Sequence, residues 1–379
     1  MKKNFFIIGA GCFGSTLAHL IATKCNEKVT VVEKRDHIGG NCYSFLDPKT
    51  GICCHKYGSH IFHTSSKEVY NFISQFVELN HYRHFVMTRS NGDVYSMPIN
   101  LRTINKFFKK NFRPHEAKIF LNNKISESHI DKPRNLEEQA VSLIGKDLYH
   151  AFIRGYTKKQ WQRDPKDLPS FIIRRLPFRC DYNTDYFNDF YQGIPVGGYT
   201  KLFEGLLNHK NIEIKLNTDF KDIKDNISSE DIVIYTGPID EYFNYCYGKL
   251  EWRTLDFQWE ILNEQDYQGC ACMNEADEDI PYTRTHEFKH FHPECTDIME
   301  SENTIICREY SKEFKDGDTP YYPVNNNKNN EILEKYKEKA SSLKNVFFGG
   351  RLGTYQYLDM DKSILQALNF FKQNMKGFM

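Results

Sequence analysis

The sequence predicts an α/β fold in which a Rossmann-like domain carries a mainly helical insertion and an antiparallel β-sheet domain. Three observations support this fold class. The first forty residues show the pattern strand, glycine-rich turn, helix, strand. The chain of 379 residues exceeds what a single hydrophobic core usually organises. Further strand-like runs occupy residues 211–216, 231–236 and parts of 253–312.

The first motif is a glycine-rich turn between a strand and a helix. Residues 4–8 form a short apolar run, and residues 15–25 carry apolar side chains at helical spacing. Gly9 allows the tight turn, Gly11 lets the backbone approach a pyrophosphate, and Gly14 lets the helix pack on the strand. The N-terminus of the helix then offers free N–H groups to phosphate. The motif therefore predicts a dinucleotide-binding site.

The kind of dinucleotide follows from the residues after this helix. A second strand ends in Glu33, whose carboxylate suits a ribose diol and disfavours the 2′-phosphate of NADP. A second glycine pair, Gly39 and Gly40, is typical of flavoproteins and favours FAD over NAD, with a plain Gly-Gly turn as the alternative. The residues expected to contact FAD in this part of the chain are Gly9, Gly11, Cys12, Phe13, Gly14, Glu33, Lys34, Gly40 and Asn41.

The remaining chain divides into three expected domains, with the active site in the cleft between them. Within the helical part, Asn135 is expected to cap a helix that ends at Gly145. The expected boundaries are 1–80 with 200–260 and 340–379 for the Rossmann-like FAD-binding domain, 100–185 for the helical substrate and lid domain, and 80–100 with 186–200 and 260–335 for the antiparallel sheet domain.

Composition excludes several classes of function. Lys plus Arg equal Asp plus Glu at 50 each, so the chain has no overall field that would recruit nucleic acid or an anionic membrane. The eleven cysteines show neither a disulfide framework nor metal-ligand spacing, and we expect reduced thiols in a cytoplasmic protein without a metal site. No apolar run approaches the ~20 residues that span a bilayer, so membrane insertion is not expected.

Six blocks along the chain occur in an order that resembles bacterial UDP-galactopyranose mutases. The resemblance implies the interconversion of UDP-galactopyranose and UDP-galactofuranose, for the biosynthesis of cell-surface polysaccharide. It also implies a homodimer that uses reduced FAD and an external reductant such as NADPH. The blocks are residues 55–64 (HKYGSHIFHT), 155–161 (GYTKKQW), 191–202 (YQGIPVGGYTKL), 235–240 (YTGPID), 281–284 (PYTR) and 349–351 (GGR).

The chemistry implied by this resemblance is nucleophilic catalysis by the cofactor. Flavin N5 attacks the anomeric carbon, expels UDP and holds the sugar as an adduct while its ring opens and closes again, without net redox change. Two catalytic arginines, Arg175 and Arg284, match the family, and arginine suits the diphosphate leaving group because its planar fork binds two oxygens. Arg175 lies in a segment that resembles the mobile lid of the family, although a solvated basic turn is the alternative. His60 is the third catalytic candidate, near flavin and sugar.

The resemblance also implies the residues around the substrate and the flavin ring. Aromatic residues at roughly one side of a predicted helix are expected to bind uracil, although the same stripe suits a helix core. A helix that begins near residue 360 would direct its positive end at the reduced flavin. His63 is expected to be a core hydrogen-bonding residue. The substrate residues are Phe152, Tyr156, Thr157, Trp161, Tyr186, Tyr310 and Tyr357, and the further flavin residues are His60, Ile61, Arg253, Arg351, Asp359 and Met360.

Three positions depart from the family pattern. Ser59 stands where many members have alanine, and His84 and Cys270 align approximately with asparagines near the sugar. A changed polar partner can alter which hydroxyl or N-acetyl group is tolerated. UDP-N-acetylgalactosamine or another UDP-hexopyranose is therefore an alternative substrate. Two further alternatives are an FAD oxidoreductase of the amine-oxidase-like fold and a non-enzymatic nucleotide-sugar sensor.

Overall fold

A parallel β-sheet forms one end of the molecule. The computed structural model describes residues 4–173 and 178–375. The strands follow the order β16, β10, β1, β2, β9, and every neighbouring pair is parallel. The predicted strands at 211–216 and 231–236 are confirmed as β9 and β10. The bounds are β1 Phe5–Ile8, β2 Val29–Val32, β9 Ile212–Lys215, β10 Ile232–Tyr235 and β16 Val346–Phe348.

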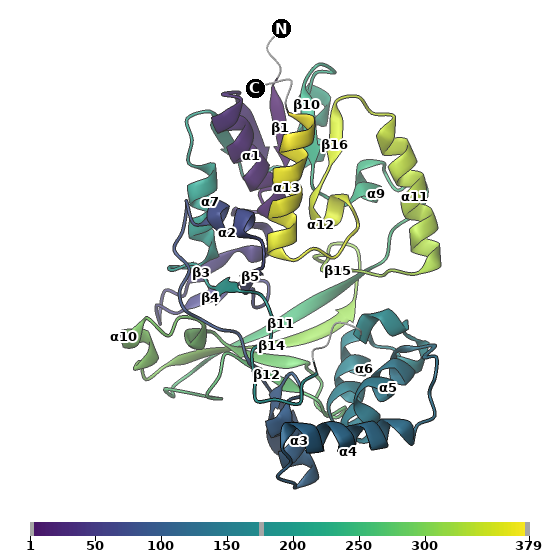
Figure 1. Ribbon diagram of the computed structural model, residues 1–379. Helices are drawn as coiled ribbons and strands as arrows, with labels where there is room; N and C mark the ends of the chain where they lie inside the picture. Colours follow the sequence, from purple (N-terminus) through teal and green to yellow (C-terminus); the bar gives the residue numbers. More distant parts are fainter. Residues whose placement is uncertain (1–3, 174–177, 376–379) are drawn as a thin grey trace.

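Helices cover both faces of this sheet because its strands alternate their apolar side chains between the faces. Phe5 and Ile7 pack in the core that contains α1, α7, α13 and α2, and Ile8 joins a second core with α8 and α9. Figure 1 shows α1 and α13 side by side against the sheet. The bounds are α1 Cys12–Lys24, α2 Lys67–Ile73, α7 Tyr199–Leu207, α8 Phe220–Ile223, α9 Ile239–Tyr242 and α13 Met360–Asn374.

A second sheet of seven strands lies below the first in Figure 1. Its order is β15, β11, β14, β13, β12, β6, β7. The expected antiparallel pairing is found throughout except between β12 and β6, which are parallel. The bounds are β6 Val86–Ser90, β7 Asp93–Met97, β11 Trp252–Leu262, β12 Cys272–Glu275, β13 Arg284–Glu287, β14 Thr304–Glu313 and β15 Tyr322–Pro323.

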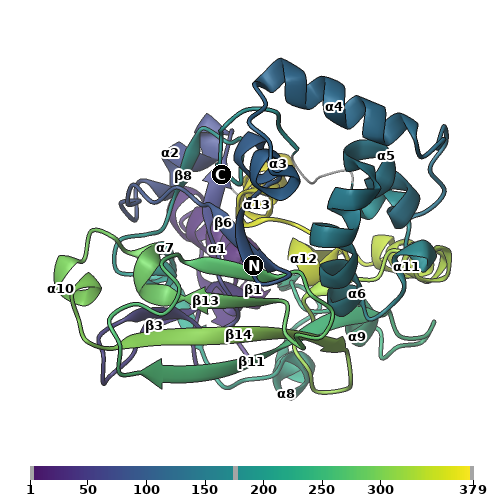
Figure 2. The ribbon, with the colours of Figure 1, turned by 90° about the horizontal axis from the view of Figure 1, so that it is seen from below.

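A group of helices packs at one side of this sheet (Figure 2). As predicted, Asn135 caps a helix: its side chain accepts a hydrogen bond of 2.9 Å from the Glu138 N–H. The helix is interrupted at Gly145, where φ is 78°. A π-helical turn, Tyr149–Arg154, follows it. The bounds are α3 Leu101–Phe108, α4 Pro114–Ser126, α5 Leu136–Leu148 and α6 Gly155–Trp161.

Short elements complete the fold and show where the expected boundaries differ from the sheets. β11 lies wholly in the seven-stranded sheet and crosses the boundary drawn at residue 260. β8 pairs with β5 in a separate two-stranded sheet and not with the large one. The remaining bounds are β3 Ser44–Leu46, β4 Cys53–His55, β5 Phe62–Thr64, β8 Tyr191–Gly193, α10 Thr296–Met299, α11 Asn327–Ser341 and α12 Gly350–Gly353.

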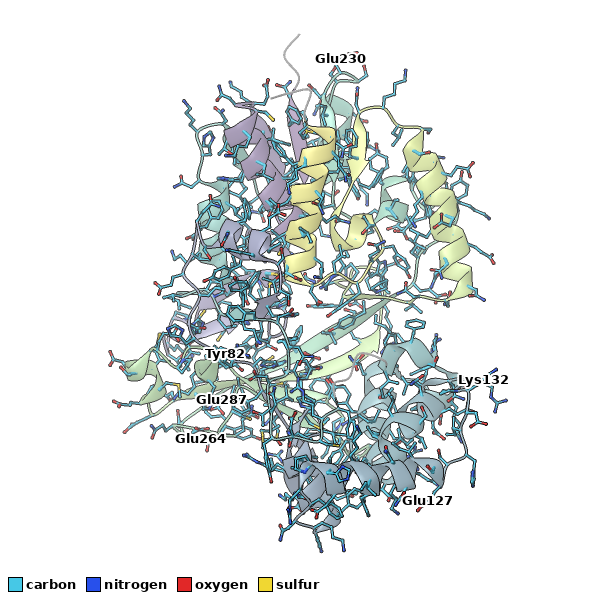
Figure 3. The ribbon with its side chains drawn as sticks, viewed as in Figure 1. Tyr82, Glu127, Lys132, Glu230, Glu264 and Glu287 are labelled. Atoms are coloured by element: carbon cyan, nitrogen blue, oxygen red, sulfur yellow. The ribbon has the colours of Figure 1, made fainter. Side chains whose placement is uncertain are left out.

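The parallel sheet and the helical group lie at opposite ends of the molecule. In Figure 3, Glu230 marks one end, and Glu127 and Lys132 mark the other. Among the helices that the structure describes, none is long and apolar enough to cross a membrane.

Candidate active site

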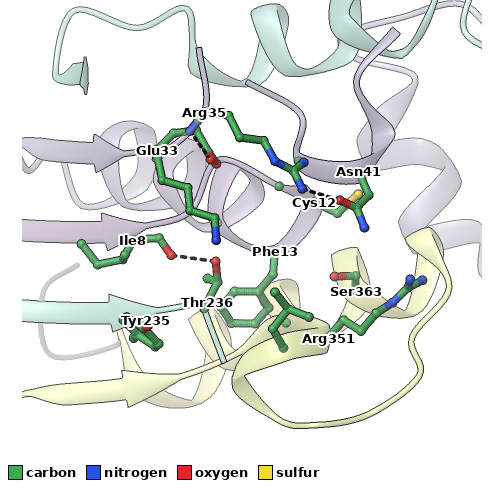
Figure 4. A pocket seen from close by; sticks show the side chains of 18 of the residues that line it. Ile8, Cys12, Phe13, Glu33, Arg35, Asn41, Tyr235, Thr236, Arg351 and Ser363 are labelled. Atoms are coloured by element: carbon green, nitrogen blue, oxygen red, sulfur yellow. Dashed lines mark hydrogen bonds between the residues drawn. The ribbon is translucent and has the colours of Figure 1, made fainter. Parts of the chain in front are cut away.

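The glycine-rich turn borders a cavity of about 210 Å³, here called the glycine-rich cavity. Figure 4 shows Glu33, Arg35 and Asn41 on one wall and Arg351 and Ser363 on the opposite wall. The residues that were expected to contact the dinucleotide in the first part of the chain all line this cavity: Gly9, Gly11, Cys12, Phe13, Gly14, Glu33, Lys34, Gly40 and Asn41.

Steric contacts explain why glycine occupies this turn. Gly9 has a φ of 109°, and a Cβ added there would lie 2.0 Å from the Thr236 hydroxyl oxygen. A Cβ on Gly14 would lie 2.0 Å from the Gly9 carbonyl oxygen. A Cβ on Gly11 would meet only the Gly40 Cα, at 4.0 Å, so the backbone there faces open space. The cradle therefore fits a phosphate group that approaches the backbone closely.

The carboxylate of Glu33 is buried at the end of β2 and is held in place by the backbone. One oxygen accepts a 2.9 Å hydrogen bond from the Ala10 N–H, and the other accepts a 3.0 Å bond from the Arg35 N–H. Each oxygen retains further acceptor capacity. The Arg35 guanidinium donates to the Asn41 side chain at 2.9 Å and stabilises the adjoining loop. The geometry agrees with the role of a ribose acceptor.

A second cavity of about 690 Å³, here called the large cavity, lies between the seven-stranded sheet, helix α6 of the helical group and the start of α13. It adjoins the glycine-rich cavity, since His60, Arg351 and Met360 line both. The volume is within the range of about 300–1,000 Å³ that is typical of ligand sites. The arrangement allows a dinucleotide in one cavity to meet a second ligand in the other.

A buried network of charges lies in the wall of the large cavity. Glu309 accepts from His286 Nε2 at 3.2 Å, and its other oxygen lies 3.5 Å from Arg284 Nε. Burial opposes ionisation of Glu309, but Arg284 and His286 outweigh it and lower its pKa to about 2. Burial likewise opposes charge on His286, but Cys272 and Glu309 raise its pKa to about 9. The network thus holds two cations on one carboxylate.

Arg284 is the cation of this network that lines the large cavity. Its Nη2 donates to the Tyr156 hydroxyl, and its guanidinium carbon lies 5.7 Å from the centre of the Tyr156 ring. Burial opposes its charge, but the Glu309 carboxylate raises the pKa of Arg284. Arg284 therefore stays charged at any physiological pH and presents a fixed positive group to a ligand.

His60 lies at the junction of the two cavities in a neutral state. Its Nδ1 lies 2.8 Å from the Gly58 carbonyl oxygen, which can only accept a hydrogen bond, so Nδ1 carries the proton. Burial, with help from the positive charge of Arg351, lowers the pKa of His60 to about 4. Its Nε2 is therefore a hydrogen-bond acceptor at neutral pH.

Helix α13 begins at this junction, as the sequence predicted. The N-cap residue Asp359 makes no side-chain cap, so the first N–H groups of α13 are not satisfied by it. Asp359 lines the large cavity, Ser363 lines the glycine-rich cavity, and Met360 lines both. The positive end of a fifteen-residue helix therefore faces the place where the cavities meet.

Most predicted substrate and flavin-ring residues line the large cavity. Ser59 and His84 are among them, and burial lowers the pKa of His84 to about 3, which keeps this ring neutral. Arg253, Ile61 and Asp359 line the large cavity but not the glycine-rich one. Arg175 lies outside the described residues. The predicted residues along the large cavity are Ser59, His60, Ile61, His84, Trp161, Tyr186, Arg253, Arg284, Arg351, Tyr357, Asp359 and Met360.

The structure places two of the predicted uracil-binding residues elsewhere. Phe152 packs in the core of the helical group, 4.9 Å from Tyr95 and 5.5 Å from Phe107 between ring centres. Thr157 is also buried away from the cavity lining. The cause is the π-helical turn Tyr149–Arg154, which breaks the regular helical spacing on which the prediction rested. Tyr156 reaches the site through Arg284.

Two further predicted substrate residues, Tyr310 and Cys270, do not line the large cavity. Tyr310 follows Glu309 on the same strand, and successive residues of a strand point to opposite faces of the sheet. The Tyr310 hydroxyl therefore lies on the face away from the cavity, where it donates a hydrogen bond of 2.9 Å to the Gln258 side chain. Cys270 is buried before β12, where its thiol donates to the Cys272 carbonyl, and it does not line the cavity. Asn274, at the other end of β12, does.

Sequence reasoning missed several residues of the large cavity. Tyr322 lines the cavity and lies 5.7 Å from Tyr357 between ring centres. Phe187 stacks on His63 at 3.6 Å, and His63 Nδ1 lies 2.6 Å from Asp189 Oδ2. His63, which was expected to be a core residue, lines the large cavity as well. The pair of tyrosines before Pro323 was a signal for Tyr322, whereas nothing local distinguishes Phe187.

The fold and the glycine-rich cavity define a protein of the dinucleotide-binding class, with a second cavity beside the first. Residues 7–76 match the NAD(P)-binding Rossmann-like domain family, and residues 151–357 match the UDP-galactopyranose mutase family. The chain belongs to the UDP-galactopyranose mutase family, whose members are isomerases that interconvert pyranose and furanose forms of a nucleotide sugar.

Individual relatives agree with this assignment along nearly the whole chain. The chain is 44% identical to a Klebsiella pneumoniae protein named "Probable UDP-galactopyranose mutase", over 97% of this chain and 93% of that protein. It is 43% identical to an Escherichia coli dTDP-fucopyranose mutase, over 97% of both chains. A crystal structure of reduced UDP-galactopyranose mutase has the same fold, with a TM-score of 0.76, 16% identity and coverage of 99% of this chain and 96% of that one.

Proposed function

We propose that this protein interconverts UDP-galactopyranose and UDP-galactofuranose with FAD in its reduced state. The observation that carries the proposal is the shared wall of the two cavities at His60, Arg351 and Met360. A cofactor and a nucleotide sugar placed in these cavities would meet there. Family membership supports the reaction class.

The residues of the glycine-rich cavity fit FAD. Gly9, Gly11 and Gly14 leave room for a pyrophosphate, and Glu33 offers acceptors for a ribose diol. At the junction, the N-terminus of α13 favours negative charge on a bound ring system. When bound and reduced, FAD would supply the nucleophile for the anomeric carbon.

Arg284 would stabilise the negative charge that develops on the diphosphate leaving group. Its guanidinium is held from behind by Glu309 and from the side by Tyr156, so it needs little reorganisation during reaction. Tyr186, Tyr322 and Tyr357 would add neutral donors and exclude water. Arg175, as a second cation on a lid, remains a proposal from the family resemblance.

His60 would orient the sugar by accepting a hydrogen bond from one of its hydroxyl groups. Its Nδ1 proton is held by the Gly58 carbonyl, so Nε2 is the atom with a free lone pair at the junction. The low pKa of His60 keeps this acceptor available at neutral pH. Orientation of a sugar hydroxyl is the task that a neutral ring at this place can perform.

Turnover under defined redox conditions tests the proposal. We expect dithionite-reduced protein with FAD to convert UDP-galactofuranose without stoichiometric use of NADPH or oxygen, and oxidised protein to be inactive. Arg284→Ala should lower kcat by about 10²–10³, as the loss of one charge-stabilising donor does. Arg308→Ala is the matched control, because Arg308 lies on the same strand as Glu309, pairs with Glu260 at 2.8 Å and does not line the large cavity.

Other outcomes would favour the alternatives. Turnover by the oxidised protein with matching oxygen uptake would indicate an oxidoreductase. Tight binding of UDP-galactose without any turnover in either redox state would indicate a nucleotide-sugar sensor. An external reductant such as NADPH and a homodimer remain predictions, to be checked by flavin bleaching and by light scattering.

The sugar and the nucleotide of the substrate call for a separate comparison. Nearly equal identity to a UDP-galactopyranose mutase and to a dTDP-fucopyranose mutase favours a test of both. Ser59, His84 and Asn274 place polar groups along the large cavity, and such groups discriminate between hydroxyl, acetamido and deoxy positions. Comparison of kcat/KM for UDP-galactofuranose, its 2-acetamido counterpart and dTDP-fucofuranose identifies the native substrate.

A further inference from the structure

Two neighbouring cysteines line the glycine-rich cavity. Cys12 is the first residue of α1, and Cys42 ends the 3₁₀ turn Gly40–Cys42 that follows the second glycine pair. Their sulfur atoms lie 3.7 Å apart, and both residues line the cavity. Figure 4 shows the Cys12 side chain beside Asn41, on the same wall as Arg35. Composition alone predicts ordinary reduced thiols at both positions.

The two thiols differ in acidity. The hydrogen bond with Cys42, together with the charge of Arg351, lowers the pKa of Cys12 against the effect of burial. The same hydrogen bond and burial raise the pKa of Cys42. Cys12 also stands at the N-terminus of a thirteen-residue helix, a position that favours a thiolate. Cys12 is therefore the nucleophile of the pair and Cys42 the resolving thiol.

The backbone around the pair already joins the two segments. The Gly39 N–H donates to the Ala10 carbonyl at 2.9 Å, and a Cβ on Gly40 would lie 3.2 Å from the Gly11 Cα. A disulfide requires a sulfur–sulfur distance of about 2.05 Å, so the two sulfurs must approach each other by less than about 2 Å. The segments that carry the two cysteines are therefore already in contact.

We propose that Cys12 and Cys42 form a redox-active dithiol, which hydrogen peroxide closes to a disulfide across the dinucleotide cradle. The Cys12 thiolate attacks one peroxide oxygen, the O–O bond breaks, and hydroxide leaves while Cys12 becomes a sulfenic acid. The Cys42 sulfur then attacks the Cys12 sulfur, the S–O bond breaks, and water leaves. The two thiols lose two electrons in total, and one peroxide is reduced to two waters.

The cross-link would tie the phosphate-binding turn to the second glycine loop. Because both residues line the cavity, a bound dinucleotide would restrict access of peroxide to the pair and slow its oxidation. Conversely, the oxidised cradle would take up FAD more slowly than the reduced one. The dithiol itself does not depend on the proposed function, whereas the protection by FAD does.

Peptide mapping of peroxide-treated full-length protein tests the inference. Flavin is removed by dialysis against potassium bromide, peroxide is added, and free thiols are alkylated before digestion without reductant. We expect a peptide containing Cys12 joined to one containing Cys42, lighter than their sum by two hydrogen atoms. Dimedone traps a sulfenic acid. It should label Cys12 in the Cys42→Ser variant, and it should leave Cys42 unlabelled in the Cys12→Ser variant.

A matched control lies just beyond the other end of α1. Cys25→Ser, which changes the thiol just after the end of α1, should cross-link like the unchanged protein. Refilling with FAD should slow cross-linking severalfold. The proposal would be overturned if Cys12 and Cys42 were still alkylated when the exposed Cys246 and Cys295 had already been oxidised. Dimedone labelling of Cys42 in the Cys12→Ser variant would overturn it as well. The readout is a mass and not turnover, so failure here is distinct from failure of the proposed reaction.

Discussion

Replacement of His286 by glutamine should remove a pH-dependent part of the stability of the seven-stranded sheet. His286 is fully buried on β13, and its ring bonds the Glu309 carboxylate at 3.2 Å. Its pKa is about 9 in the folded protein, against 6.5 for an unperturbed histidine. The folded state therefore retains a proton on this ring that the unfolded chain loses near neutral pH.

The sign and size of the effect follow from the two pKa values of His286. The raised pKa contributes stability that is fully present below pH 6.5 and is lost as the pH rises through 9. At about 1.4 kcal/mol for each pH unit between the two values, this contribution is roughly 3 kcal/mol. Other groups titrate in this window, including Lys159, whose pKa burial lowers to about 8. The difference between the unchanged protein and His286→Gln cancels their effects.

Urea unfolding followed by tryptophan fluorescence measures this difference. Two of the three tryptophans, Trp252 and Trp259, lie on β11 of the same sheet and report its unfolding. We expect the free energy of unfolding of the unchanged protein to fall by roughly 3 kcal/mol more than that of the variant between pH 6 and pH 10. A constant difference across this range would show that His286 is neutral in the folded state, and the charge network described above would be wrong.

Three further substitutions follow from the same geometry. Gly14→Ala should abolish flavin retention in an absorbance assay, because the new Cβ would lie 2.0 Å from the Gly9 carbonyl oxygen. Tyr322→Phe should lower kcat/KM about tenfold through loss of one hydrogen bond to the substrate, while Tyr310→Phe should leave it unchanged; equal losses would contradict the assignment. Asn80→Ala should cost about 2–4 kcal/mol in urea unfolding, because its buried amide makes hydrogen bonds to two backbone N–H groups and a backbone carbonyl.

The dinucleotide cradle was predictable because its determinants are local. Gly9, Gly11 and Gly14 act within one turn, and Glu33 follows at the end of the next parallel strand, where its carboxylate reaches the Ala10 N–H. The helix that begins at Met360 was predictable for the same reason, since its apolar side chains recur at helical spacing within one segment. Neither feature requires knowledge of a distant partner.

The large cavity was predictable only through the family resemblance, and even then incompletely. Tyr322 lines the cavity and Tyr310 does not, and the reason is not local. The face to which a residue of β14 points depends on the register of β14 against β11, which pairs residues about fifty positions apart. Phe152 does not share a face with Trp161 as expected, because the π-helical turn Tyr149–Arg154 changes the angle between successive side chains. Such departures arise from packing and leave no mark in local spacing.

By itself, the sequence determined the strand–turn–helix cradle, the fold class and the positions of the principal elements, since these depend on backbone sterics and short-range periodicity. Only the tertiary structure decided that Glu309 joins Arg284 and His286, and that Cys12 faces Cys42. These contacts form between segments whose distance in space is set by the packing of whole sheets and helices. Charge pairing and thiol pairing depend on that distance, and spacing along the chain does not specify it.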